Sequence, residues 1–224
     1  MRDTAGRMPT LPGTRCRALF ACTPFVYFVA FVDTSSPPSF TAVLLAGGKS
    51  TRMGRDKAAL LIGGEPLWQH QLATLRATGA GELFISGRAD GPYAESGVRI
   101  IEDLTPNAGP LAALEAVLPR ISGTHAIVLA IDLPAMRADF LAALVKVALA
   151  RNCSVVPEAE GRFEPLAAVY APGLLPLVAE GLRGPDRSMQ HLLRAALAIG
   201  LVMTHPLHAG ERALFRNLNA PADL

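Results

Sequence analysis

Cysteine is scarce in this 224-residue sequence, which has only Cys16, Cys22 and Cys153. Their spacing matches no zinc-binding pattern, and so small and odd a number argues against a disulfide-stapled scaffold. The five histidines form no ligand-spaced pair on one helix face, so we interpret them as surface or packing residues. Since few cysteines are typical of reducing compartments, we expect a cytoplasmic protein.

Charge is also sparse, because 18% of the residues are charged and the net charge is only +2. No long basic run is present, so we expect no nucleic-acid surface. Hydrophobic residues make up 50% of the chain, which excludes a disordered polymer and fits a domain with a substantial core. We find no internal repeat and no boundary that would divide residues 40–224 into two domains.

The first 39 residues differ from the rest. A polar segment with several arginines precedes the mostly apolar run 18–32, which Thr23 and Pro24 interrupt, and a Ser/Pro-rich linker follows. The run is too short for a confident membrane-spanning helix, and no clean cleavage site follows it. Three interpretations stay open: a start codon chosen too far upstream, a disordered or loosely packed tail, and a membrane-targeting segment. We favour the first two, and expect an extension over 1–39 and one domain over 40–224.

Two common phosphate-binding loops are absent. A P-loop ending at Gly48-Lys49-Ser50 needs a glycine five residues before Gly48, where the chain has Val43. The dinucleotide fingerprint also fails, because Gly47 and Gly48 are adjacent and the next glycine is Gly54.

A different phosphate-binding pattern lies between Thr41 and Lys57. An apolar run, Ala42–Ala46, ends at two glycines and passes into a polar loop that carries the cations Lys49, Arg52, Arg55 and Lys57. Glycines let backbone N–H groups approach a ligand, and Arg and Lys donate charge-assisted hydrogen bonds to phosphate oxygens. The pattern predicts a polyphosphate site, and the alternative is a glycine turn with solvated basic residues.

Apolar strands alternate with helices along the remaining chain. We expect strands at 42–46, 83–86, 98–101 and 126–131, and helices that begin at Pro66, Pro110 and Ala138. Beyond residue 151 we expect a short strand at 154–157, an antiparallel return at 164–170, two helices near 173–182 and 187–199, and a last strand at 201–204. This order predicts an α/β fold with one Rossmann-like, mostly parallel, doubly wound sheet and a small antiparallel addition.

Two acidic residues directly follow expected strands. Asp103 comes after 98–101, and Asp132 comes after the continuous apolar run 126–131. Ligands of open α/β sheets bind beyond the carboxyl ends of the strands, so both acids should share an edge with the glycine loop. Carboxylate and phosphate oxygens are the ligands that Mg²⁺ prefers. The alternative for each aspartate is a turn or helix-capping role.

The motif L-A-G-G-x-S-x-R-M-G-x-D-K, from Leu45 to Lys57, resembles the opening motif of nucleotidyltransferases that activate a small phosphorylated substrate with an NTP. The similarity is strongest to the molybdenum cofactor guanylyltransferases and covers about residues 40–224. Further matching segments follow in the family's order; they are Gly64–Leu67, Ile101–Asp103, Gly109–Leu111, Asp132–Pro134, Glu164–Leu166 and Asn217–Pro221. These later segments and the glycine pair favour the guanylyl over the cytidylyl branch.

The resemblance implies roles for individual residues. Those that match the family's nucleotide site are Leu45, Ala46, Gly47, Gly48, Lys57, Asp103 and Asp132. Arg52 and Lys57 would contact the phosphates, and Asp132, with Asp103, would bind Mg²⁺. Glu164, Asn217 and Asn219 match the region of the second substrate, and turn formation before Pro221 is the alternative for the two asparagines. The family often has Asn where this chain has Ser86 or Gly87, which leaves one guanosine contact unassigned.

The resemblance implies transfer of GMP from GTP to the phosphate of molybdopterin, with pyrophosphate as the second product. Molybdoenzyme maturation proteins are possible partners, and membrane attachment is not expected. Two alternatives stay open within this chemistry, a cytidylyltransferase of molybdopterin and a nucleotidyltransferase for another small phosphate. A third alternative, from another class, is a non-catalytic protein that binds nucleotide or cofactor for delivery.

Overall fold

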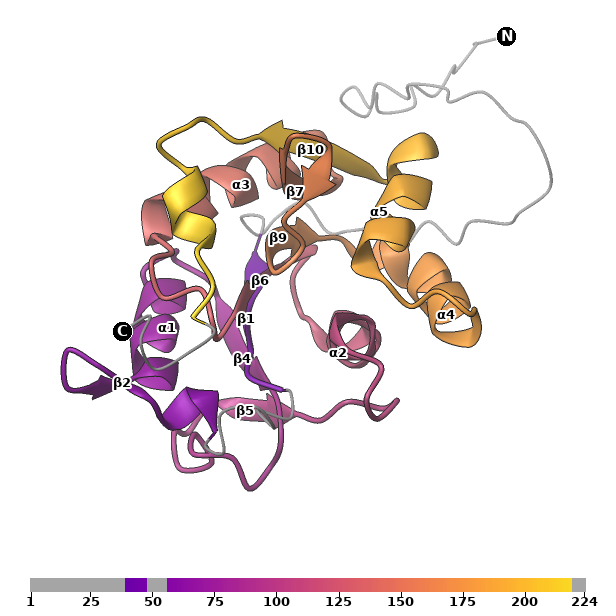
Figure 1. Ribbon diagram of the computed structural model, residues 1–224. Helices are drawn as coiled ribbons and strands as arrows, with labels where there is room; N and C mark the ends of the chain where they lie inside the picture. Colours follow the sequence, from indigo (N-terminus) through magenta and orange to yellow (C-terminus); the bar gives the residue numbers. More distant parts are fainter. Residues whose placement is uncertain (1–38, 48–55, 219–224) are drawn as a thin grey trace, which may run out of the picture. The chain divides into compact units, whose positions relative to one another are not determined.

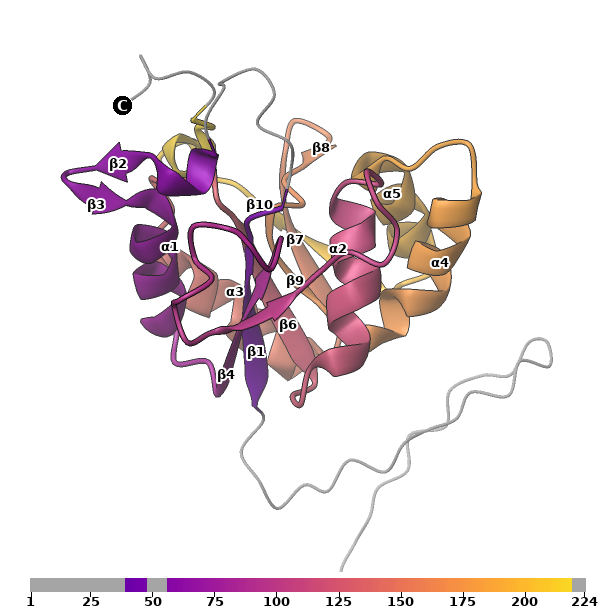
Figure 2. The same cartoon turned by 90° about the horizontal axis from the view of Figure 1, so that it is seen from below.

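The computed structural model describes residues 39–47 and 56–218 of the chain. In this part of the molecule, a central sheet lies between two layers of helices (Figures 1 and 2). Its strands are β1 (Phe40–Leu45), β4 (Glu82–Ser86), β5 (Arg99–Ile101), β6 (His125–Ala130), β7 (Ser154–Ala159), β8 (Arg162–Phe163), β9 (Ala167–Tyr170) and β10 (Val202–Pro206). The helices are α1 (Leu67–Arg76), α2 (Pro110–Val117), α3 (Ala138–Arg151), α4 (Leu175–Arg183) and α5 (Met189–Ala198).

The strand order in the sheet is β10-β7-β9-β6-β1-β4-β5, and β8 pairs with β7. Strand β1 is parallel to both of its neighbours, β4 and β6, and β5 is parallel to β4. Every residue of β1 and β6 is buried, as expected of parallel strands that are covered on both faces. The predicted α/β fold class is therefore confirmed.

The antiparallel addition is also present, but its strand is shorter than predicted. Strand β9 runs antiparallel to β6 and β7, and it starts at Ala167 because residues 165 and 166 form a turn. Strands β7 and β8 form a hairpin whose turn residues Glu160 and Gly161 both have positive φ, 53° and 77°. Positive φ at both central positions is what a two-residue type I′ hairpin turn requires.

The segment before α1 differs from the prediction. Strands β2 (Leu61–Ile62) and β3 (Glu65–Pro66) form a separate two-stranded hairpin around Gly63 and Gly64, which the sequence did not predict. Pro66 precedes the helix as its cap residue instead of opening it. Pro110, in contrast, is the first residue of α2, as predicted.

The core has two parts, one on each face of the sheet. Side chains of α1 and α3 pack with Leu44 and Leu129 on one face, and those of α2, α4 and α5 pack with Val43 and Val128 on the other. The division follows from strand geometry, since successive side chains point to opposite faces. Among the described residues, no helix is long and apolar enough to cross a membrane.

Candidate active site

The carboxyl ends of four parallel strands meet at one edge of the sheet, which we call the rim. Gly47 lies two residues beyond β1, Ser86 is the last residue of β4, and Asp103 and Asp132 each lie two residues beyond β5 and β6. Because these strands are parallel and adjacent in the sheet, their ends face the same side. Both aspartates and the start of the glycine loop therefore lie on the same edge of the sheet, as the strand pattern predicts.

Lys57 and Asp132 meet at the rim. The Lys57 Nζ lies 3.4 Å from Asp132 Oδ2 and donates a hydrogen bond of 2.9 Å to the backbone carbonyl of Leu218. Their side chains are 20% and 24% exposed, so both remain accessible to a ligand. The backbone N–H of Leu218 donates to the Asp132 carbonyl at 2.8 Å. Three segments that are far apart in the sequence are thereby joined at one point.

Asp56 fixes the backbone from which Lys57 projects. Its carboxylate accepts a hydrogen bond of 3.0 Å from the backbone N–H of Ala58 and so caps the 3₁₀ helix Lys57–Ala59. The other carboxylate oxygen of Asp56 accepts from Arg88 at 3.2 Å, which ties this helix to the segment after β4.

Asp103 has a different set of neighbours. The hydroxyl of buried Ser86 donates to Asp103 Oδ1 at 3.5 Å, and Oδ2 lies 4.0 Å from the point where a Cβ on Gly47 would stand. Burial raises the pKa of the Asp103 carboxyl, and the Ser86 hydrogen bond partly opposes this rise. The Ser86 carbonyl accepts from the backbone N–H groups of Ala46 and Gly47, at 2.8 and 3.0 Å. Asp103 is therefore held beside the start of the glycine loop.

The structure describes some of the remaining predicted site residues and not others. Glu164 is half-buried, and burial raises the pKa of its carboxyl, whereas the nearby charge of Arg162 lowers it. Asn217 is exposed and adjoins Leu218. Gly48, Arg52 and Asn219 lie outside the described residues.

Comparisons with known proteins identify the family. Residues 42–200 match the model of the family described as MobA-like NTP transferase domain. A probable molybdenum cofactor guanylyltransferase of Opitutus terrae is 36% identical over 85% of this chain and 95% of that protein, and the enzyme of Serratia proteamaculans is 34% identical over 82% and 91%. The chain belongs to the MobA-like NTP transferase family.

Solved structures agree with this family assignment. Molybdopterin-guanine dinucleotide biosynthesis protein A from Archaeoglobus fulgidus superposes with a TM-score of 0.67 at 25% identity, over 82% of this chain and 94% of that one. The 2-C-methyl-D-erythritol 4-phosphate cytidylyltransferase of Thermus thermophilus, at 20% identity and a TM-score of 0.59, shares the fold over 81% of this chain and 93% of its own.

Two residues of this MobA-like transferase that the sequence analysis did not single out also lie at the rim. Gln71 in α1 is fully buried and hydrogen-bonds to the backbone around Asp132. The hydroxyl of buried Tyr93 accepts a 2.9 Å hydrogen bond from the backbone N–H of Arg88, just beyond the end of β4. Of these two residues, only Gln71 could have been noticed in the sequence, because it is a polar residue that shares a helix face with Leu67 and Leu75.

The donor set at the rim suits Mg²⁺. In the segments that the structure describes, no three His, Cys, Asp or Glu side chains are arranged to hold a metal ion by themselves. Mg²⁺ is commonly bound by one or two carboxylates together with water and substrate phosphates. Asp132 fits an ion that arrives with a nucleotide, whereas Asp103 follows β5, which β1 and β4 separate from β6 in the sheet.

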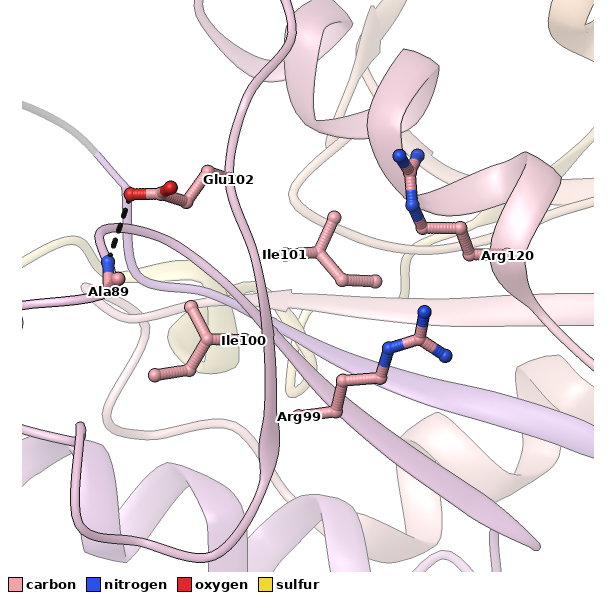
Figure 3. Close-up of a pocket in the computed structure, with 6 residues that line it drawn as sticks. All are labelled: Ala89, Arg99, Ile100, Ile101, Glu102 and Arg120. Atoms are coloured by element: carbon pink, nitrogen blue, oxygen red, sulfur yellow. Dashed lines mark hydrogen bonds between the residues drawn. The ribbon is translucent and has the colours of Figure 1, made fainter.

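A cavity of about 300 Å³ lies beside β5 (Figure 3). It is lined by Ala89, Arg99, Ile100, Ile101, Glu102 and Arg120. The Arg99 guanidinium lies 5.3 Å from the centroid of the Phe84 ring, and Glu102 accepts from the Ala89 N–H at 3.0 Å. None of these lining residues is among the predicted site residues, so we assign the active site to the rim and not to this cavity.

Proposed function

We propose that this protein transfers GMP from GTP to the phosphate of molybdopterin, releasing pyrophosphate and forming the guanine dinucleotide form of the molybdenum cofactor. The observation that carries the proposal is that relatives named as molybdenum cofactor guanylyltransferases match this chain over more than nine-tenths of their own length. The pairing of Lys57 with Asp132 at the rim supports it, because nucleotidyl transfer needs a cation and a carboxylate near the phosphates.

In this reaction an oxygen of the molybdopterin phosphate attacks the α-phosphorus of GTP. A new bond forms between that oxygen and the α-phosphorus, and the bond from the α-phosphorus to the bridging β-phosphate oxygen breaks. The second pKa of a phosphate monoester is near 6, so the nucleophile is already an anion at neutral pH. No strong base is needed, and the protein acts through positioning and charge stabilisation.

Each part of the rim has a proposed role. The backbone from Leu45 to Gly48 would border the nucleotide, and Arg52 and Lys57 would bind its phosphates. Asp132 and Asp103 would hold Mg²⁺, which when bound neutralises charge on the phosphates and on the leaving pyrophosphate. Glu164, Asn217 and Asn219 would contact molybdopterin.

On this proposal the reaction takes place in the cytoplasm. The resemblance implies cytoplasmic substrates, and the chain has few cysteines. Maturation proteins of molybdoenzymes would then receive the product.

The test is pyrophosphate release by the full chain with molybdopterin and Mg²⁺, with GTP, CTP or ATP as the nucleotide. Release with GTP and not with CTP or ATP is the expected result. Release with CTP would retain the mechanism and overturn the choice of base. Binding of GTP without pyrophosphate release from any nucleotide would instead favour a delivery protein, and would overturn the proposal.

A further inference from the structure

The turn that carries Asp132 rests on a buried amide. Gln71 lies in α1, its side chain is fully buried, and its Nε2 is 2.9 Å from the carbonyl oxygen of Leu133 and 3.1 Å from that of Ala130. The carbonyl of Ile131 is also near, at 3.5 Å. The side chain therefore contacts the backbone on both sides of Asp132.

The orientation of this amide follows from hydrogen-bond chemistry. A carbonyl oxygen only accepts, so the NH₂ end of Gln71 must face the three carbonyls and its two protons go to the two shortest contacts. The opposite atom, Oε1, is buried without a hydrogen-bond partner among the described residues. Burying an unpaired acceptor is unfavourable, and the other buried residues of α1 are the apolar Leu67, Leu72 and Leu75. The hydrogen bonds that Gln71 makes to the backbone therefore all come from its NH₂ group.

Neighbouring contacts hold the same turn from other directions. The Pro134 carbonyl lies 3.1 Å from Nε2 of His70, which must carry the proton in this bond. The Ile131 N–H donates to the Leu45 carbonyl at 3.0 Å, and the Leu218 N–H donates to the Asp132 carbonyl at 2.8 Å. Backbone on both sides of Asp132 is fixed, while its carboxylate is left to face Lys57.

We infer that Gln71 is a positioning residue for the metal-binding carboxylate of Asp132. By donating to the carbonyls of Ala130 and Leu133, it sets the path of the turn and thereby the direction of the Asp132 side chain. Groups behind a metal ligand that fix its orientation contribute strongly to metal affinity. This inference rests on the proposed role of Asp132 as a ligand of Mg²⁺.

The test measures metal affinity directly. Mn²⁺, a paramagnetic substitute for Mg²⁺, is titrated into the full chain with GTP and followed by electron paramagnetic resonance. Gln71→Met keeps a similar volume and removes both donors, so we expect the Kd for Mn²⁺ to rise about 10-fold or more. His70→Ala removes only the contact to Pro134, so it should raise the Kd for Mn²⁺ by a smaller factor. Because His70 is less buried than Gln71, this second variant tests the inference with a milder change to the core.

Gln190 in α5 offers a matched control, because its side-chain amide also clamps backbone, donating to the Phe163 carbonyl at 2.8 Å and accepting from the Phe163 N–H at 3.2 Å. Gln190→Met should lower the unfolding temperature and leave the Kd for Mn²⁺ unchanged. If Gln71→Met and His70→Ala also bind Mn²⁺ like the wild type, Gln71 has only a structural role and the inference is wrong. If the wild type itself binds no Mn²⁺ with GTP, the assignment of Asp132 as a metal ligand fails first, and the inference with it.

Discussion

Asp132 and Lys57 form an ion pair at the rim whose side chains are 24% and 20% exposed, so a ligand can reach both. The cost of desolvating two mostly buried charges offsets much of their Coulomb attraction, so we expect the pair to make a small net contribution to the stability of the fold.

We accordingly expect Asp132→Ala to abolish pyrophosphate release and to change the unfolding temperature only slightly. The loss follows from removing the carboxylate proposed to hold the metal, and both quantities can be measured on the full chain. Asp90→Ala is the control, since the Asp90 side chain is 84% exposed and pairs with Arg88 at the surface. Activity like that of the wild type in Asp132→Ala would rule out the metal assignment.

Asp103 gives the unliganded protein a pH-dependent stability. Burial raises the pKa of its carboxyl above the unfolded value, which is about 3.9 for aspartate. The folded protein therefore binds more protons than the unfolded chain between these two pKa values, and stability falls as the pH rises through the folded pKa.

Asp103→Asn removes this ionisation, so the variant should unfold at a higher temperature than the wild type at pH 7. The difference should disappear below about pH 4, where both side chains are neutral. Thermal unfolding over a pH series without nucleotide or metal measures it, with Asp90→Asn as the exposed control. A difference of opposite sign, or one that is independent of pH, would contradict this account.

The residues of the site differ in how far sequence could predict them. Asp103 and Asp132 follow the parallel strands β5 and β6, and the structure puts both at the rim because the end of a strand fixes where the next residues lie. The contact of Lys57 with Leu218 was not predictable, since it joins positions 161 residues apart. Gln71 was missed for a similar reason. The sequence shows a polar residue on an apolar helix face, but it does not show which distant turn packs against that helix.

At the level of elements, the segment after β4 is shaped by close packing of Tyr93 against Gly87. A Cβ on Gly87 would overlap the Tyr93 hydroxyl and lie 2.8 Å from Cζ of its ring. Tyr93 is 1% exposed, so its ring is enclosed by the protein and does not project into solvent. The glycine permits this contact, and with it the hydrogen bond that holds Arg88 beyond the rim.

Gly87→Ala should therefore lower the free energy of unfolding by about 1–3 kcal/mol, the usual cost of adding a methyl group to a filled space. Chemical denaturation measures this change. Gly210→Ala is a suitable control because a Cβ there would meet nothing within 4 Å. Equal stability of the two variants would mean that Tyr93 can give way.

Elements with strong local signals were predicted well. The apolar run 126–131 predicted most of strand β6, which starts one residue earlier at His125, and α2 begins at the predicted proline, Pro110. The β2–β3 hairpin was missed because each strand has only two residues, too few for a periodic pattern. Strand β9 was predicted too long because alternation of residue types does not reveal the turn at Pro165.

At the scale of the whole described domain, the alternation of strands and helices was enough to predict a mostly parallel α/β sheet. The order of strands across the sheet was not predictable from the sequence. Strand β9 lies between β6 and β7 and pairs antiparallel with both, although β7 precedes it in the chain. Such an arrangement depends on contacts between distant segments, which local patterns do not record.

The tie between Leu218 and the rim has a consequence for biosynthesis. Leu218 is buried and bonds to both Lys57 and Asp132, yet the ribosome adds it 161 residues after Lys57. A nascent chain can form the sheet from its earlier segments as they emerge, because domains begin to fold during synthesis. It cannot close the junction of Lys57, Asp132 and Leu218 until the ribosome has also added Leu218. The sheet can therefore form first, and the junction at the rim closes only after Leu218 has emerged.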